Sequence, residues 1–233
     1  MNWMKKVAVA LVCLLPLGLQ AAKVDTLQVK SPSMNKSIEV VVVSPDMAAT
    51  EACPVIYLLH GYGGNARTWV GIKPDLPKIA DEKGIFFVCP DGKNTWYWDS
   101  PLNADVRYET FISDELVKYV DSHYKTVADR KGRAITGLSM GGHGAMWNGL
   151  RHSDVFSAAG STSGGVDIRP FPKNWEMSVQ IGEKAKYPEN WEKYTVINLV
   201  PTLRKDQIAL IFDCGDSDFF LEVNKNYHEG LLK

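Results

Sequence analysis

Continuous apolar runs, separated by helical patterns, restrict the fold of this chain more than any other sequence feature. The strong runs occupy residues 53–60, 84–92, 133–139 and 207–215, and a weaker one occupies 156–164. Runs of this kind are typical of strands that are buried on both faces. Helical patterns lie between them, at 108–124, 140–151 and 218–232. The alternation predicts an α/β fold, with a mostly parallel central sheet and helices on both faces.

Two further regions complete the predicted organisation. Residues 25–30 and 38–43 have the pattern of an antiparallel pair of strands at the start of the domain. Residues 166–203 contain four prolines and two tryptophans without a strand pattern, which indicates an insertion or cap-like segment over the sheet. The chain has 233 residues, of which 45% are hydrophobic. This length and composition fit one globular domain, which we expect over 23–233.

The first 22 residues have the pattern of a secretory signal peptide. A basic start, MNWMKK, precedes the apolar run VAVALVCLLPLGL and the small residues QAA. The run is short for a membrane span, so we expect export to the periplasm or the outside of the cell, without a stable membrane anchor. The net charge of -1 gives no indication of a nucleic-acid partner, and the oligomeric state stays open.

Residues 137–141, Gly-Leu-Ser-Met-Gly, join an apolar run to a helical segment. A strand, a tight turn and a helix in this order lift a serine hydroxyl out of a sheet, where it can act as a nucleophile. Ser139 is therefore the candidate nucleophile, and the backbone N–H of Met140 is a candidate for the oxyanion hole. The alternative is an ordinary glycine-rich turn between a strand and a helix.

A second glycine-rich stretch, His60-Gly61-Tyr62-Gly63-Gly64, follows the run at 53–60. Acyl transfer places negative charge on the former carbonyl oxygen, and two preorganised N–H groups can stabilise that charge. Glycines allow the backbone to approach a substrate closely. We expect the backbone N–H of Tyr62 to be the second donor, and the alternative is a flexible turn.

At this point the sequence resembles the esterase D-like branch of the α/β-hydrolases. The resemblance depends on LLHGYGGN, CPDG, YETFISDEL, GLSMGGHGA and DCGDSDFF in that order, and it runs from about residue 35 to the end. That branch includes S-formylglutathione hydrolases, feruloyl and acetyl-xylan esterases, and mycolyltransferases, and this chain is most similar to exported carbohydrate-esterase-like members. The resemblance implies that Ser139 is the nucleophile, that Tyr62 supplies an oxyanion N–H and that Asp218 orients the catalytic histidine. From the residues alone, Asp213, Asp216 and Asp218 are all candidates for that acid.

The sequence contains no clear candidate for the catalytic histidine. In this fold the order is serine, acid, histidine, and only His228 follows Asp218. A helix between the two residues would separate them by about 15 Å. The resemblance implies that the histidine follows a further strand, so we expect a chain truncated at its C-terminus, with the last strand and helix missing and little activity. His60 and His143 have structural interpretations, and His123 and His152 are expected to be solvated.

The combined hypothesis is a serine carboxylesterase that works through an acyl-enzyme on Ser139. The substrate would be an ester, such as acetyl or feruloyl groups on plant polysaccharide. Trp96 and Trp98 could stack on a sugar or an aromatic acid, or they could pack a loop. The scattered cysteines and histidines suggest no metal, and no cofactor is implied. The alternatives are an acyltransferase to a sugar hydroxyl and a non-catalytic carbohydrate-binding pseudoenzyme.

Overall fold

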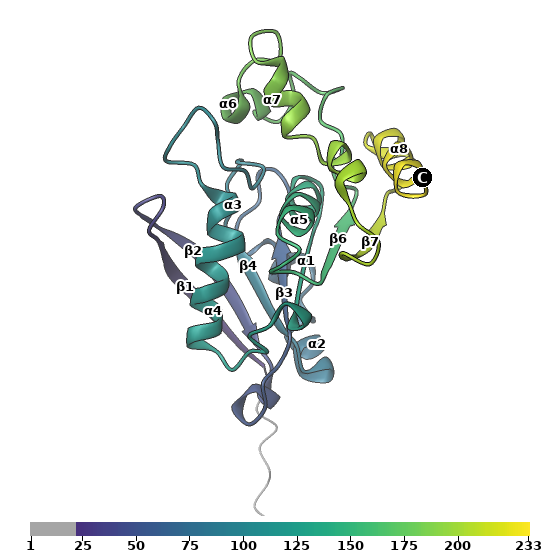
Figure 1. Cartoon of the computed structure of the whole chain (residues 1–233). Coiled ribbons are helices and arrows are strands. Elements are labelled where there is room, and N and C mark those ends of the chain that lie inside the picture. The colour runs from purple at the N-terminus through teal and green to yellow at the C-terminus, as the bar shows by residue number, and fades with distance from the viewer. Residues whose placement is uncertain (1–21) are drawn as a thin grey trace, which may run out of the picture.

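The computed structural model describes residues 22–233, so the predicted signal peptide at 1–22 lies, except for its last residue, outside the described residues. The described chain forms a seven-stranded sheet in the order β1-β2-β4-β3-β5-β6-β7 (Figure 1). The strands are β1 (Lys23–Ser31), β2 (Lys36–Ser44), β3 (Val55–Leu59), β4 (Phe86–Pro90), β5 (Arg133–Gly137), β6 (Ala158–Thr162) and β7 (Ala209–Asp213). Each lies within, or overlaps, a segment for which the sequence predicts a strand.

The sheet is mixed, and its antiparallel part is N-terminal. β1 pairs antiparallel with β2, and β2 pairs antiparallel with β4. The remaining pairs, β4 with β3, β3 with β5, β5 with β6 and β6 with β7, are parallel. The predicted architecture, a mostly parallel sheet with antiparallel N-terminal strands, is therefore confirmed.

Helices cover both faces of the sheet, but unequally. They are α1 (Thr68–Ile72), α2 (Leu76–Lys83), α3 (Tyr108–Thr110), α4 (Leu116–His123), α5 (Met140–Arg151), α6 (Met177–Ile181), α7 (Pro188–Lys193) and α8 (Leu221–Leu231), with 3-10 turns at Asp46–Ala49, Arg130–Gly132 and Val196–Thr202. The larger core lies on the face where α4, α5 and α8 pack. A smaller core under α1 and α2 covers the other face over β2, β4 and β3.

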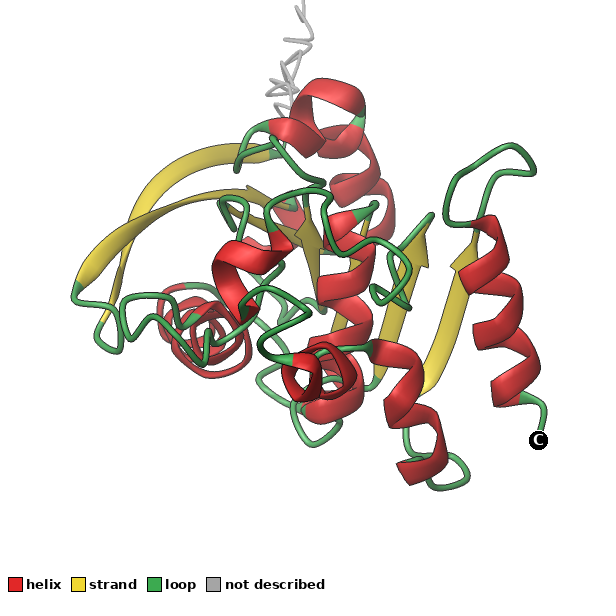
Figure 2. Cartoon of the chain, turned by 90° about the horizontal axis from the view of Figure 1, so that it is seen from above, coloured by secondary structure: helices red, strands yellow, loops and turns green. Residues whose placement is uncertain are grey.

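The edge of the sheet at β7 is only partly covered. Phe212 packs toward α8, and its ring centroid lies 5.1 Å from that of Tyr227. Ile211 points to the opposite face and is 76% exposed. Figure 2 shows the C-terminal helix α8 beside this edge strand.

The segment predicted to be one helix over 108–124 contains a π-helical turn at Phe111–Glu115, between α3 and α4. Within it, the hydroxyl of Ser113 donates to the carbonyl oxygen of Glu109 at 2.7 Å. The buried Glu109 carboxylate accepts from Trp147 Nε1 at 2.8 Å and from Arg151 Nε at 2.7 Å. Single π-helical turns inside α-helices are a known local variation, which apolar spacing alone does not reveal.

Residues 166–203 carry α6, α7 and the 3-10 turn at Val196–Thr202, and none of these residues lies in a strand. Figure 1 shows α6 and α7 beyond the end of the sheet toward which β6 and β7 point. This is the end where loops after parallel strands form pockets. Among residues 22–233, no helix has the length and apolar character needed to cross a membrane.

Candidate active site

Ser139 lies at the sharp turn between β5 and α5. Its backbone has φ 57° and ψ -116°, a region that non-glycine residues rarely adopt. Its N–H donates to the Thr162 carbonyl oxygen at 2.9 Å, which ties the turn to the end of β6. Its side chain is half-buried and therefore accessible. Strain of this kind persists only where the surroundings fix it, and it is typical of functional turns.

The glycines around Ser139 are required by close backbone packing. A Cβ built at Gly137 would overlap the carbonyl group of Gly141, and one built at Gly141 would overlap the carbonyl oxygen of Leu59. No side-chain rearrangement relieves these overlaps, because the obstructing atoms are backbone. The turn can therefore form only with glycine at both positions.

The loop after β3 lies directly beside the serine. A Cβ built at Gly61 would lie 3.5 Å from the Cβ of Ser139. The loop is closed by a hydrogen bond from the Gly64 N–H to the Gly61 carbonyl oxygen at 3.0 Å, and Gly63 has φ 77°. Within residues 22–233, neither Tyr62 nor Met140 donates its backbone N–H to another protein group. The two predicted oxyanion donors are thus unpaired on the two segments that meet at Ser139.

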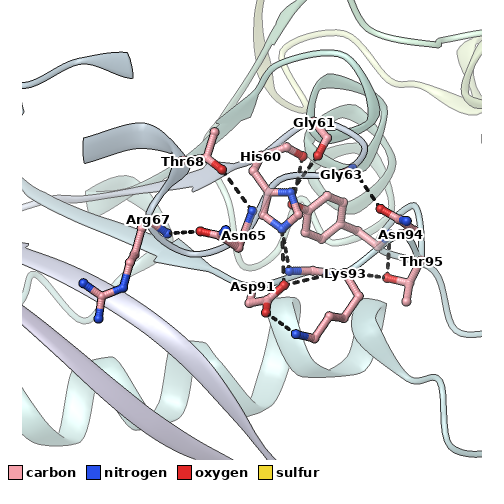
Figure 3. A network of polar contacts seen from close by, with 12 residues as sticks. His60, Gly61, Gly63, Asn65, Arg67, Thr68, Asp91, Lys93, Asn94 and Thr95 are labelled. Carbon is pink, nitrogen blue, oxygen red and sulfur yellow. Dashed lines mark hydrogen bonds and ion pairs between the residues drawn. The ribbon is translucent and has the colours of Figure 1, made fainter. Parts of the chain in front are cut away.

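His60 supports this loop from below (Figure 3). Its ring is fully buried, and its Nε2 accepts from the Gly92 N–H at 2.9 Å. Its Nδ1 lies 2.8 Å from the Gly61 carbonyl oxygen. Since Nε2 accepts, Nδ1 carries the proton and donates to Gly61. Both nitrogens are engaged, so His60 holds the loop in place, as the sequence predicts.

His143 is also fully engaged, on the first turn of α5. Trp98 Nε1 donates to its Nε2 at 2.8 Å, so Nδ1 carries the proton and donates to the Gly165 carbonyl oxygen at 2.8 Å. Complete burial lowers the pKa of His143 to about 4, although the hydrogen bond to Gly165 acts in the opposite direction. His143 is therefore a neutral packing residue beneath the turn.

The other three histidines lie away from Ser139. His152 contacts the buried Glu109 carboxylate at 2.8 Å, and His123 contacts the Tyr119 carbonyl oxygen at 2.8 Å. His228 lies in the last turn of α8, with its ring centroid 6.1 Å from that of Phe212. In the part of the chain that the structure describes, no histidine side chain forms a hydrogen bond with Ser139.

Asp218 lies in the loop between β7 and α8, where its carboxylate accepts the N–H of Phe220 at 2.7 Å. Its carbonyl oxygen accepts the N–H of Leu221 at 3.0 Å, so both bonds belong to the turn that leads into α8, whose N-cap is Phe220. Asp213 accepts from the hydroxyl of Thr162 at 3.3 Å, and Asp216 is exposed. Asp218 thus fixes this turn with one carboxylate oxygen and keeps the other available.

Trp96 and Trp98 do not line an open site. They are 1% and 0% exposed, and their rings stack at 5.6 Å while both contact the edge of His143. Stacking on a substrate would require unpacking this cluster, so the structure favours the packing interpretation over the substrate-binding one. The aromatic side chains that do reach the surface here are those of Tyr62, Trp175 and Phe219. The sequence indicates Tyr62 for its backbone N–H alone and does not indicate Trp175 or Phe219. The position of Phe219 next to Asp218 is the signal that could have identified it.

Among residues 22–233, no group of three or more His, Cys, Asp or Glu side chains is arranged to hold a metal ion. The groups that this region offers are a strained serine, unpaired backbone donors and a carboxylate. They suit attack on a carbonyl carbon with stabilisation of the resulting oxyanion.

The sheet order and the turn at Ser139 define an α/β-hydrolase, and comparison with solved structures agrees. A ferulic acid esterase matches with a TM-score of 0.74 and 28% identity, over 91% of this chain and 86% of that one. FphF, a fluorophosphonate-binding serine hydrolase of Staphylococcus aureus, matches with a TM-score of 0.79 at 19% identity, over 91% of this chain and 87% of that one. The second likeness concerns the fold alone.

The esterase family model matches residues 31–229, and the chain belongs to this family. An acetyl esterase of Caldicellulosiruptor saccharolyticus is 25% identical over 195 residues, which cover 76% of this chain and 70% of that protein. An esterase of Mycobacterium tuberculosis is 30% identical over 149 residues, covering 61% of this chain. That match spans about a third (32%) of the mycobacterial protein's length. The predicted resemblance to esterase-like α/β-hydrolases is confirmed.

Proposed function

We propose that this protein is a serine carboxylesterase in which Ser139 is the nucleophile. The observation that carries the proposal is the backbone of Ser139, held at φ 57° beside the glycine loop after β3. In this proposal the hydroxyl attacks a carbonyl carbon whose oxygen is held by the N–H groups of Tyr62 and Met140. Each such donor contributes about 3 kcal/mol to lowering the barrier in comparable sites.

In the proposed reaction, Ser139 Oγ bonds to the carbonyl carbon and loses its proton to a base. The C–O bond to the alcohol then breaks, and the alcohol leaves with that proton. Water next attacks the acyl-enzyme, which releases the acid and restores the hydroxyl of Ser139. Asp218 would orient the base. Because none of the described histidines reaches Ser139, we expect residues 22–233 by themselves to turn over slowly, on the order of a millionfold below a complete triad.

The substrate that we propose is an acetyl or feruloyl ester on a polysaccharide. The proposal is supported by the similarity to an acetyl esterase and to a ferulic acid esterase. The signal-peptide pattern at the N-terminus supports export, to the periplasm or beyond, where such polymers occur. A second candidate is a non-catalytic carbohydrate-binding protein, which is favoured by the engagement of His60 and His143 in packing.

The test is rescue of the missing base by a small molecule. The chain and its Ser139→Ala variant are incubated with p-nitrophenyl acetate, with and without imidazole. Imidazole hydrolyses this ester slowly by itself, and the Ser139→Ala protein reports that background together with any reaction elsewhere on the surface. We expect the difference between the two proteins to be small without imidazole and to increase with imidazole concentration.

Equal rates for the two proteins at every imidazole concentration would contradict the role of Ser139 and favour the non-catalytic candidate. Rapid Ser139-dependent hydrolysis without imidazole would instead contradict the expected low turnover. It would mean that a base within the chain reaches Ser139.

A further inference from the structure

Three aromatic side chains from separate segments form an exposed rim connected to Ser139. We define the aromatic rim as Tyr62, Trp175 and Phe219. Phe219 is 59% exposed and Tyr62 is 38% exposed, while Trp175 is half-buried. The ring centroids of Trp175 and Phe219 lie 5.1 Å apart with their planes 30° from parallel. Trp175 and Phe219 thus form a continuous exposed aromatic surface, and exposed apolar surface of this kind often marks a binding site.

The rim is connected through Glu176 to the glycine-rich loop after β3 (residues 60–64), which we call the oxyanion loop. Partial desolvation and a hydrogen bond to the Glu176 carboxylate raise the pKa of Tyr62. The Asn94 side chain donates to Glu176 at 3.3 Å and accepts the Gly63 N–H at 2.9 Å. Since Gly61, beside Ser139, precedes Tyr62 and Phe219 follows Asp218 directly, the rim runs from the candidate nucleophile to the candidate acid.

The backbone holds Trp175 at the rim under strain. Trp175 and Glu176 have φ 47° and 54°, two consecutive non-glycine residues in the left-handed region. This costs about 1–3 kcal/mol per residue and persists only where other contacts over-determine it. Here Trp96 Nε1 donates to the Trp175 carbonyl oxygen at 3.1 Å, and the Trp175 ring packs against Phe171 and Phe220. The buried Trp96 therefore supports the rim from beneath.

The charge around the rim distinguishes between possible ligands. The Glu176 carboxylate is exposed, and Asp216 and Asp218 lie in the same loop as Phe219. Among the ion pairs of residues 22–233, none neutralises these three carboxylates. An anionic aromatic acid would be repelled here, whereas sugar hydroxyls donate to carboxylates and the C–H faces of sugar rings pack on aromatic rings.

We propose that the aromatic rim, with Glu176, is a subsite for a neutral sugar ring on the alcohol side of the substrate. The proposal rests on the proposed esterase function because it assigns the rim to the substrate of Ser139. The bound ring would lie on Trp175 and Phe219, and its hydroxyls would donate to Glu176.

Binding is measured by titration calorimetry with xylotetraose, and with ferulic acid as the anionic aromatic probe. We expect xylotetraose to bind, and Trp175→Ala and Phe219→Ala each to weaken binding by about tenfold or more, a loss of about 1.4 kcal/mol. Trp175→Phe keeps a ring and should lose less. Ile211→Ala, which removes an even more exposed apolar side chain from β7, is the control and should bind as the original chain does.

Ser139→Ala should bind xylotetraose with unchanged affinity, so failure of the esterase proposal and failure of the subsite are distinguishable. Absence of xylotetraose binding would overturn the subsite even if Ser139 proves reactive. Binding that survives in the Phe219→Ala protein, whose side chain is too exposed to be needed for folding, would also overturn it. Binding of ferulic acid in place of xylotetraose would reassign the rim to an aromatic acid and overturn the sugar assignment.

Discussion

The ends of β5 and β7 each contribute one candidate catalytic residue, and they are built differently. At the end of β5, Ser139 is fixed by backbone-to-backbone packing that leaves no space for a Cβ at Gly137 or Gly141. At the end of β7, a Cβ built at Gly215 would meet nothing closer than 3.9 Å, and Asp218 is held by the turn in which its carboxylate accepts the N–H of Phe220. The nucleophile is therefore preorganised by the fold, while the acid depends on local contacts.

The same contrast appears along one row of side chains across the sheet. Leu58, Thr136, Gly160 and Ile211 are neighbours on β3, β5, β6 and β7, on the face that α1 and α2 pack against. Leu58 is 5% exposed beneath those helices, whereas Ile211 is 76% exposed. Helices cover one end of the row, and the other end is exposed. The same difference in packing separates the turn at Ser139 from the loop at Asp218.

The largest expected effect is from Gly141→Ala. Because the added Cβ overlaps the Leu59 carbonyl oxygen, we expect the free energy of unfolding to fall by about 4 kcal/mol or more. Gly215→Ala is the matched change in the loop after β7, and it should alter the free energy of unfolding by less than about 1 kcal/mol. Urea denaturation of the two variants checks this. Similar losses in both would mean that the two loops are equally constrained.

Next in size is the pH dependence that His143 confers. Its pKa is lowered to about 4 in the folded protein, against about 6.5 when unfolded, because of its burial. The unfolded state therefore binds more protons between these values, and about 3 kcal/mol of stability present above pH 6.5 is lost as the pH falls toward 4. Urea denaturation at a series of pH values should show a flatter profile for His143→Gln. A profile as steep in His143→Gln as in the original chain would contradict the assignment.

Asp218→Ala should lower the free energy of unfolding by about 1 kcal/mol, because the N–H of Phe220 loses its acceptor in the turn before α8. Asp218→Asn keeps an acceptor oxygen and should cost less. Thermal unfolding of both proteins, with the exposed Asp216→Ala as control, measures the difference. Equal losses for Asp216→Ala and Asp218→Ala would argue against a stabilising role for the hydrogen bond from Phe220 to Asp218.

The smallest effect is expected for Ile211→Thr. An exposed side chain contributes little, so the free energy of unfolding should change by less than about 0.5 kcal/mol. Leu58→Thr, in the covered part of the same row, should lower the free energy of unfolding by at least about 2 kcal/mol. Denaturation of this pair compares the open and closed ends directly. A large loss in Ile211→Thr would mean that this face is covered in the native protein.

The strands and the serine turn could be predicted from the sequence because their signals are local. Buried parallel strands appear as continuous apolar runs, and the turn requires glycines at fixed offsets from Ser139. The links from Glu176 and Asn94 to the oxyanion loop could not be predicted in this way. The bond between Gly63 and Asn94 joins residues 31 positions apart, and the bond between Asn94 and Glu176 joins residues 82 positions apart. The second bond also depends on the path of residues 166–203.

The tryptophans show the limit of residue type as a guide to role. Trp96 and Trp98 lie in a loop with the composition of a sugar-binding surface, yet they are buried against His143. Trp175, which lies in a segment without a clear pattern, reaches the surface. Burial depends on which elements pack over a loop, and no local pattern in residues 94–100 reports it.

The measurement that tests the central claim most directly is the location of the acyl group after reaction with p-nitrophenyl acetate and imidazole. The chain is digested and its peptides are mapped by mass spectrometry, with Ser139→Ala as the reference. We predict acetylation at Ser139 in the original chain, above the surface lysine acetylation common to both proteins. Acetylation of lysines alone, at equal levels in the two proteins, would contradict the assignment of Ser139 as the nucleophile.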